Sequence, residues 1–168
     1  TDVLVVVMSG VEKPNNIRTV LQETLKPLKS KIAIATSGGI DSASLVMAAQ
    51  DLGKKQTLVS FTFDDFESHD FKSARLLAKH FDLDFLPVFL PSDQNEIVET
   101  VHYLIKEIKC KKKSAIECMF PFVYLLKVLK KKRIDTLVTG LAADGHFGLS
   151  KKAMIHYSKD DKKFKQLR

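Results

Sequence analysis

The chain has little of what secreted, membrane-spanning or disordered proteins are made of. Its 168 residues include two cysteines, five prolines, seven glycines and no tryptophan. Two cysteines cannot hold a small secreted scaffold together. The longest apolar run, Val3–Met8, is far shorter than the roughly 20 residues that cross a bilayer. Hydrophobic residues make up 45% of the chain, too many for a disordered protein. We therefore expect a folded, soluble protein of the cytoplasm.

The length predicts a single domain over residues 1–168. At about 150 residues per domain, such a chain can bury a sizeable core. We expect residues 1–15 to add one further strand and residues 150–168 to form a polar tail. The starting threonine and the short tail also fit an excerpt of a larger protein.

Positive charge is in excess, but only in one part of the sequence. The chain carries 27 Lys and Arg against 20 Asp and Glu, a net charge of +7. Residues 1–105 hold 10 basic and 14 acidic side chains, whereas residues 106–133 hold 10 and 2. The basic stretch Lys106–Arg133 can bind nucleic acid or an acidic partner, or can be a solvated face of Lys-rich helices. Composition leaves these interpretations open.

Short β-rich runs alternate with segments of helical period, which is typical of an α/β domain with a parallel sheet. The runs are nearly continuous in apolar residues, as in strands that helices cover on both faces. We predict strands at Val3–Met8, Ile32–Thr36, Leu58–Phe63, Phe85–Leu90 and Thr136–Thr139.

Apolar stripes at helical spacing separate these strands. They run over residues 17–28, 45–52, 71–81, 97–108 and 116–126. Ser68 is a suitable N-cap for the third helix, Asp93 or Ser92 for the fourth, and Gly53 a C-terminal stop for the second. The fourth stripe has the cleanest period in the chain.

One six-residue string predicts an anion-binding loop. Ser37-Gly38-Gly39-Ile40-Asp41-Ser42 directly follows a predicted strand and opens a predicted helix. Glycines let backbone N–H groups come close to an anion, and the helix N-terminus adds unpaired donors. An aspartate beside a phosphate indicates a bridging cation such as Mg²⁺. The plain alternative is a tight turn in which Asp41 caps the helix.

A second Gly-rich loop, Gly140–Gly148, follows the last predicted strand and contains Asp144. If Ile32–Thr36 lies between Leu58–Phe63 and Thr136–Thr139, the two loops flank the point at which the strand order reverses. Ligands of open α/β sheets bind in the crevice at that point. The aspartates of the two loops could then share one Mg²⁺.

Both loops resemble known signatures. The first resembles the S-G-G-x-D-S string of the PP-loop ATP pyrophosphatases. The second, G-L-A-A-D-G-H-F-G, resembles the G-x-G-A-D-E-x-F-G stretch of asparagine synthetases and their relatives. The resemblance covers roughly Ile17–Gly148 and implies an α/β fold of the adenine-nucleotide α-hydrolase type. It also implies a ligase that adenylylates a carboxylate with ATP, releases pyrophosphate and passes the acyl group to ammonia or an amine.

The resemblance also implies roles for individual residues, with ATP and Mg²⁺ as cofactors. Asp41 and Asp144 would ligate Mg²⁺ and take part in catalysis. Pyrophosphate would be held by Ser37, Gly38, Gly39 and Ser42. Adenosine would lie against Ser60, Phe61, Thr62, Gly140 and Leu141.

Three departures from the family pattern bear on function. The Glu that follows the second aspartate in the family is Gly145 here, followed by His146. A catalytic lysine would have to come from Lys151 or Lys152, which match by residue type alone. Residues 1–30 are too few for a glutaminase, so nitrogen would come from ammonia, an amine or a separate glutaminase.

Two other functions stay open. The basic stretch fits a PP-loop enzyme that modifies tRNA or another nucleic acid, where Cys110 and Cys118, both on predicted helices, could relay sulfur. The replacement of Glu by Gly145 fits a non-catalytic module that only binds ATP.

Overall fold

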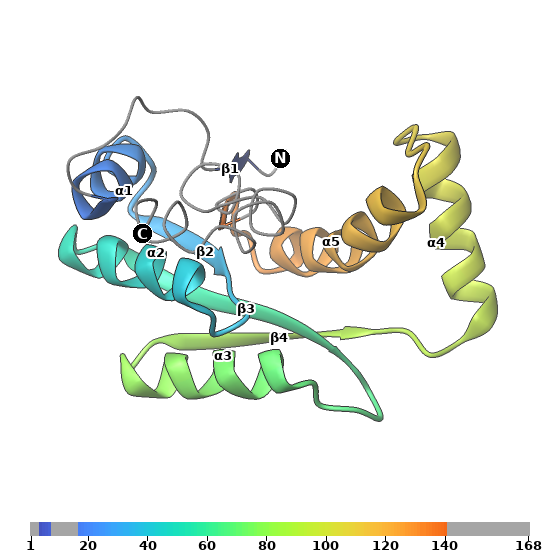
Figure 1. Ribbon diagram of the computed structural model, residues 1–168, viewed down its shortest axis with the longest axis horizontal. Helices are drawn as coiled ribbons and strands as arrows, with labels where there is room; N and C mark the ends of the chain where they lie inside the picture. Colours follow the sequence, from blue (N-terminus) through green and yellow to red (C-terminus); the bar gives the residue numbers. More distant parts are fainter. Residues whose placement is uncertain (1–3, 8–16, 141–168) are drawn as a thin grey trace, which may run out of the picture.

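The computed structural model describes residues 4–7 and 17–140 (Figure 1). It has strands β1 (Leu4–Val7), β2 (Lys31–Ala35), β3 (Lys55–Phe63), β4 (Asp84–Leu90) and β5 (Thr136–Thr139). They form one sheet in the order β1-β5-β2-β3-β4, and every neighbouring pair is parallel. The predicted α/β class is therefore confirmed. So is the predicted position of β2, between β3 and β5.

Helices connect the strands, as the apolar stripes predicted. They are α1 (Ile17–Leu25), α2 (Ile40–Asp51), α3 (His69–His80), α4 (Gln94–Lys106) and α5 (Lys113–Lys131). Ser68 caps α3 by accepting a hydrogen bond from the Phe71 amide at 3.2 Å, and Asp93 caps α4 by accepting one from the Glu96 amide at 2.9 Å. Both caps confirm the prediction. None of the described helices is long and apolar enough to cross a membrane.

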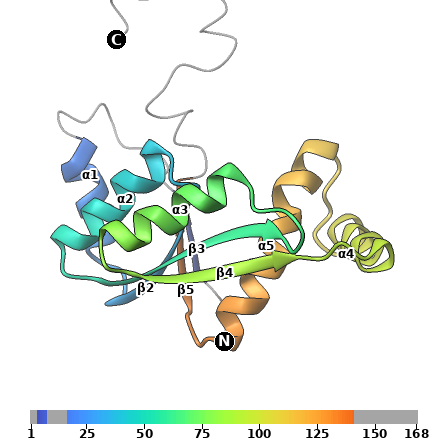
Figure 2. The same ribbon diagram turned by 90° about the horizontal axis from the view of Figure 1, so that it is seen from below.

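The core has two halves, one on each face of the sheet. Successive residues of a strand point to opposite faces, so Ile34 joins the half under α1, α2 and α3, whereas its neighbour Ala33 joins the half under α5. Leu58 and Val59 divide in the same way on β3. Figure 2 shows the first three helices on one side of β2, β3 and β4. Covering both faces explains why the strands are apolar throughout.

Helix α4 lies apart from the sheet and packs mainly on α5, at the edge of the molecule in both views (Figures 1 and 2). A buried hydrogen bond of 2.7 Å joins the hydroxyl groups of Thr100 and Tyr124 across the two helices. The apolar stripe of α4 is only partly covered as a result. Leu104 is fully buried, but Ile105 and Ile108 remain exposed.

We predict that Leu129→Ala lowers the free energy of unfolding by about 2–5 kcal/mol, because it empties a fully buried site between α5 and the sheet. Urea denaturation at fixed pH measures the change. Leu76→Ala is the matched control, since Leu76 lies on α3 and is exposed. Equal losses for the two variants would contradict this packing.

Candidate functional site

The loop between β2 and α2 is closed by a relay of hydroxyl hydrogen bonds. The Gly38 amide donates to Thr36 Oγ1 at 3.1 Å, and that hydroxyl donates to Ser42 Oγ at 2.9 Å. Ser42 in turn donates to the Gly39 carbonyl at 3.0 Å. Thr36 and Ser42 are buried, whereas Ser37 is exposed. The buried hydroxyls thus hold the loop in shape, and Ser37 is the hydroxyl of the loop that faces solvent.

Gly38 lies where no side chain fits. Its φ of +74° is in the left-handed region, and a Cβ added to it would lie 2.4 Å from Ser73 Cβ and 2.7 Å from the Ser73 carbonyl carbon. The loop therefore rests directly on the backbone of α3. Glycine is required here both for its conformation and for this close approach.

The start of α2 points its backbone donors into this loop. Gly39 is the N-cap residue and no side chain makes a cap hydrogen bond. The alternative in which Asp41 caps the helix is therefore wrong. Asp41 lies in the first turn with an exposed side chain. The first amides of a helix lack partners within it and favour an anion.

The second predicted loop begins against the first. A Cβ added to Gly140, which follows β5, would lie 3.4 Å from Asp41 Cβ. Two segments about 100 residues apart in the sequence therefore lie side by side at the carboxyl ends of β2 and β5, where the strand order reverses. Leu141, Asp144 and Lys151 lie outside the described residues.

A cleft of about 450 Å³ opens at this point. Its walls come from the two loops, the end of β3, the start of α3 and the middle of α5. Of the residues predicted to form the site, those that line it are Ser37, Asp41, Ser42, Ser60, Phe61 and Gly140. Gly38 and Gly39 belong to the same loop but are not among the lining residues.

Thr62 has a different place from the one predicted for it. Its hydroxyl bonds to the Phe66 carbonyl and accepts a hydrogen bond from the Ser68 amide at 3.2 Å. It therefore braces the connection from β3 to α3 and does not line the cleft. Sequence reasoning also missed seven lining residues, which are Ala35, Thr36, Val59, Ser68, Asp70, Phe122 and Thr139. The predicted N-cap at Ser68 could have indicated that the start of α3 lies near the cleft. No pattern in the sequence indicated that Phe122 lines it.

The cleft carries negative charge and neutral donors. Asp41 and Asp70 are its charged lining residues, and no lysine or arginine among the described residues lines it. The described residues also contain no cluster of three or more His, Cys, Asp or Glu side chains able to hold a metal by themselves. A polyphosphate would be repelled by these carboxylates unless a cation lay between them, and the phosphate oxygens would then complete the coordination of that cation.

The basic stretch divides into two separate clusters. Lys111–Lys113 lie at the start of α5 and Lys130–Arg133 at its end, so a 19-residue helix of about 28 Å separates them. The second cluster precedes β5 and lies at the edge of the sheet opposite the cleft. Cys110 lies between α4 and α5, not on a helix as predicted, and Cys118 is on α5.

The chain is similar to three solved structures, and the first of them supports the same fold. NMN synthetase from Francisella tularensis aligns with a TM-score of 0.50 at 17% identity, covering 78% of this chain and 56% of that one. An NH3-dependent NAD synthetase from Campylobacter jejuni aligns with a TM-score of 0.47 at 17% identity, and the alignment covers 72% of this chain and 51% of that one. A predicted subunit of a tRNA methyltransferase from Methanocaldococcus jannaschii aligns with a TM-score of 0.46 at 19% identity, and the alignment covers 77% of this chain and 62% of that one. The chain thus spans roughly half to three fifths of their length.

The fold and the loop at its switch point define a PP-loop protein with an adenine-nucleotide α-hydrolase type of α/β fold. The chain belongs to the asparagine synthase family, whose model matches residues 17–167. That family consists of AMP-forming ligases of the PP-loop type. No curated protein matches the sequence significantly.

We predict that Gly38→Ala destabilises the protein more than Gly53→Ala does. Both glycines have positive φ, but a Cβ at Gly53 meets nothing within 4 Å. Gly53→Ala should therefore cost only the conformational term of about 1–2 kcal/mol, whereas Gly38→Ala must also displace the loop from α3. Urea denaturation compares the two, and an equal cost would mean that the loop does not rest on α3.

Proposed function

We propose that residues 1–168 form one domain of an ATP- and Mg²⁺-dependent ligase. Its reaction is adenylylation of a carboxylate with release of pyrophosphate, followed by attack of ammonia or an amine. The observation that carries this proposal is that Asp41 and Gly140 line one cleft at the switch point. Their positions bring the phosphate loop and the start of the second family loop together.

The residues of the cleft suit the parts of ATP. The backbone amides at the start of α2 and the exposed Ser37 hydroxyl would hold pyrophosphate. Because the Ser42 hydroxyl donates to Gly39, its contribution is to keep the loop closed. Ser60, Phe61 and Gly140 also line the cleft and would contact adenosine, as would Leu141.

Asp41 fits a Mg²⁺ ligand, with Asp144 as the second. The fit rests on an exposed carboxylate in a cleft where none of the described lining residues is basic and could neutralise a phosphate. When bound, Mg²⁺ would neutralise the charge that develops on the leaving pyrophosphate. Lys151 is the proposed source of positive charge near the adenylylated intermediate.

The bonds made and broken balance as follows. A carboxylate oxygen attacks the α-phosphorus of ATP, and the bond from that phosphorus to the oxygen bridging the β-phosphate breaks. Pyrophosphate leaves and an acyl adenylate remains. The nitrogen lone pair of ammonia or an amine attacks the acyl carbon, AMP leaves with the electrons of the carbon–oxygen bond, and the nitrogen loses a proton.

We predict conversion of ATP to AMP and pyrophosphate when the protein, Mg²⁺ and ammonia are supplied with the right carboxylate. A screen over small carboxylic acids with a pyrophosphate assay finds it. Formation of ADP would rule out this chemistry. Normal ATP affinity without pyrophosphate release for any acceptor, in the chain and in any longer form of it, would favour the non-catalytic ATP-binding module.

Asp41→Asn should lower Mg²⁺-dependent affinity for a non-hydrolysable ATP analogue at least about tenfold, or about 1.4 kcal/mol, because an amide is a poorer ligand than a carboxylate. Calorimetric titration with Mg²⁺ and with a chelator measures this. Asp82→Asn is the control, since Asp82 is an exposed carboxylate on the turn between α3 and β4. Affinity retained by Asp41→Asn would remove Asp41 from the metal site.

A second candidate is a PP-loop enzyme that acts on a nucleic acid. The observation that favours it is the position of Lys111–Lys113, which are exposed and lie at the start of α5. Lys113, the first residue of that helix, is about 13 Å along it from Phe122 in the cleft. Lys113 pairs with Glu117 at 3.6 Å, and no ion pair among the described residues involves the other two.

For this candidate we predict tRNA binding that weakens steeply with salt. Reversal of charge at Lys111 and Lys112 should lower the slope of log affinity against log salt by about two, because each phosphate contact contributes nearly one. Reversal at Lys131 and Lys132, at the other end of α5, is the control. Absence of binding at low salt would exclude the candidate.

A further inference from the structure

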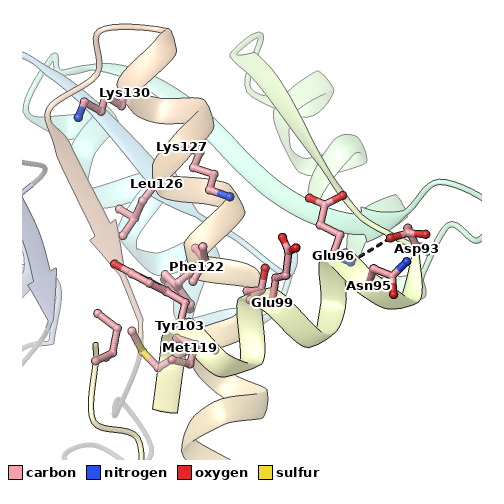
Figure 3. A pocket seen from close by; sticks show the side chains of 14 residues that line it. Asp93, Asn95, Glu96, Glu99, Tyr103, Met119, Phe122, Leu126, Lys127 and Lys130 are labelled. Atoms are coloured by element: carbon pink, nitrogen blue, oxygen red, sulfur yellow. Dashed lines mark hydrogen bonds between the residues drawn. The ribbon is translucent and has the colours of Figure 1, made fainter. Parts of the chain in front are cut away.

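A groove larger than the nucleotide cleft lies between α4 and α5. Its volume is about 1140 Å³ (Figure 3). Of its lining residues, Phe122 alone also lines the cleft. The groove is therefore a separate surface, and its role does not depend on the proposed ligase reaction.

Helix α5 is apolar on two faces, and the sheet covers only one of them. Leu125 and Leu129 are fully buried in the core half between α5 and the sheet. Phe122, Val123 and Leu126 lie at helical spacing on the adjoining face, line the groove and are only half-buried. A helix that is apolar on two faces needs neighbours on both, and α4 covers the second face only in part.

Large apolar side chains of the groove also remain in contact with water. Tyr103 is 47% exposed, Ile108 45% and Met119 38%. They line the same groove as the half-buried face of α5. An exposed apolar surface of this kind marks a site where another surface packs.

The two walls of the groove carry opposite charge. Asp93, Glu96 and Glu99 stand on the α4 wall, and Lys127 and Lys130 stand on the α5 wall (Figure 3). All five residues are exposed. None of the four ion pairs among the described residues joins one wall to the other. The charges of both walls can therefore pair with a partner.

Contacts around one buried tyrosine fix the shape of the groove. The hydrogen bond between Thr100 and Tyr124 joins the two helices, and the Lys127 ammonium lies 4.9 Å from the centre of the Tyr124 ring. Burial raises the pKa of the Tyr124 phenol, and the carboxylates of Glu96 and Glu99 raise it further because they lie near it. A preformed surface loses less conformational entropy on binding than a flexible one.

We propose that the groove between α4 and α5 is the docking site for an amphipathic α-helix of a partner protein, with basic residues along one edge of its apolar stripe and acidic residues along the other. The apolar stripe packs on the exposed apolar side chains of the groove. The basic edge lies against Glu96 and Glu99, and the acidic edge lies against Lys127 and Lys130. Helix α4 has 13 residues and is about 20 Å long, which matches a partner helix of about four turns.

Shape and charge select this occupant over others. The apolar side chains lie inside a groove, so only a convex partner reaches them, and a helix laid along two others packs in this way. A nucleic acid would be repelled by the three carboxylates of the α4 wall, as would an anionic membrane. A helix with charge of one sign would pair with one wall and be repelled by the other.

A display library of helical peptides of about four turns tests the proposal directly. Each peptide keeps a leucine stripe at helical spacing and carries lysine, glutamate or alanine at the positions along its two edges. We expect the wild-type chain to enrich peptides with lysine on one edge and glutamate on the other. Enrichment of peptides with one sign on both edges, enrichment without a charge preference, or no enrichment would overturn the proposal.

Charge reversal of one wall should change the selected peptides in a predictable direction. The variant Glu96→Lys/Glu99→Lys makes both walls largely basic and should enrich peptides that are acidic on both edges. The variant Lys127→Glu/Lys130→Glu makes both walls acidic and should enrich peptides that are basic on both edges. Selection of the wild-type pattern by both variants would mean that the peptides bind elsewhere.

Fluorescence anisotropy with the most enriched peptide measures the contribution of the apolar surface. Tyr103→Ala/Met119→Ala should bind the labelled peptide at least about tenfold more weakly, because central apolar contacts carry most of the affinity of such interfaces. Met47→Ala/Leu76→Ala is the matched control, since both residues are exposed and apolar but lie on α2 and α3. Circular dichroism checks that each variant is folded. Equal losses for the two variants would contradict docking in the groove.

A measurement without substitutions covers the case in which a variant fails to fold. Amide spectra of the wild type labelled with nitrogen-15 are recorded while the same peptide is added. The largest changes in chemical shift are expected at residues of the groove such as Thr100, Tyr103 and Val123. Largest changes on α1, α2 or α3 would place the peptide elsewhere and overturn the proposal.

Two other occupants would give different results. Flotation of the wild type with vesicles of neutral phosphatidylcholine, lost in Tyr103→Ala/Met119→Ala, would assign the groove to a lipid surface. Self-association of the wild type in sedimentation velocity, reversed by the peptide, would assign it to a second copy of the chain. Either result would overturn docking of a partner helix.

Discussion

All neighbouring strands of the sheet run parallel, and this constraint shapes the rest of the molecule. A parallel strand can be reached only by a crossover that passes over a face of the sheet, so helices must cover both faces. It also gathers the carboxyl ends of all strands at one edge. Because β2 has β3 on one side and β5 on the other, the loops that leave β2 and β5 meet at that edge, and the cleft lies there.

The nucleotide cleft and the positive charge of the protein occupy different places. Asp41 and Asp70 give the cleft a negative character, and its donors are backbone amides and hydroxyls. The lysine clusters lie at the two ends of α5. A net charge of +7 therefore says little about how a nucleotide would be held. Helix amides and a bridging cation suit a polyphosphate without a lysine cluster.

Much of the fold and half of the site could be predicted from local patterns. The strands, the caps Ser68 and Asp93, and the phosphate loop all depend on residues close in sequence, whose spacing records the local geometry. The roles of Thr62 and Phe122 could not be predicted in this way. Thr62 turns to Phe66 and Ser68 rather than to the cleft, and Phe122 reaches the cleft from a helix on the other face of the sheet. Such contacts depend on how the helices pack against the sheet, and the spacing of residues along the sequence does not encode that packing.

The sequence by itself determined the element order, the parallel class of the sheet and the identity of the loop that follows β2. It did so because strand and helix periods and glycine positions are local properties. Only the tertiary structure decided that position 38 must lack a side chain, since the backbone of α3 approaches Gly38 too closely for a Cβ atom. It also decided that α4, despite the most regular apolar stripe of the chain, packs on α5 and leaves Ile105 and Ile108 exposed. Periodicity shows which face of a helix is apolar, but the surface that covers that face is set by where the chain places the helix.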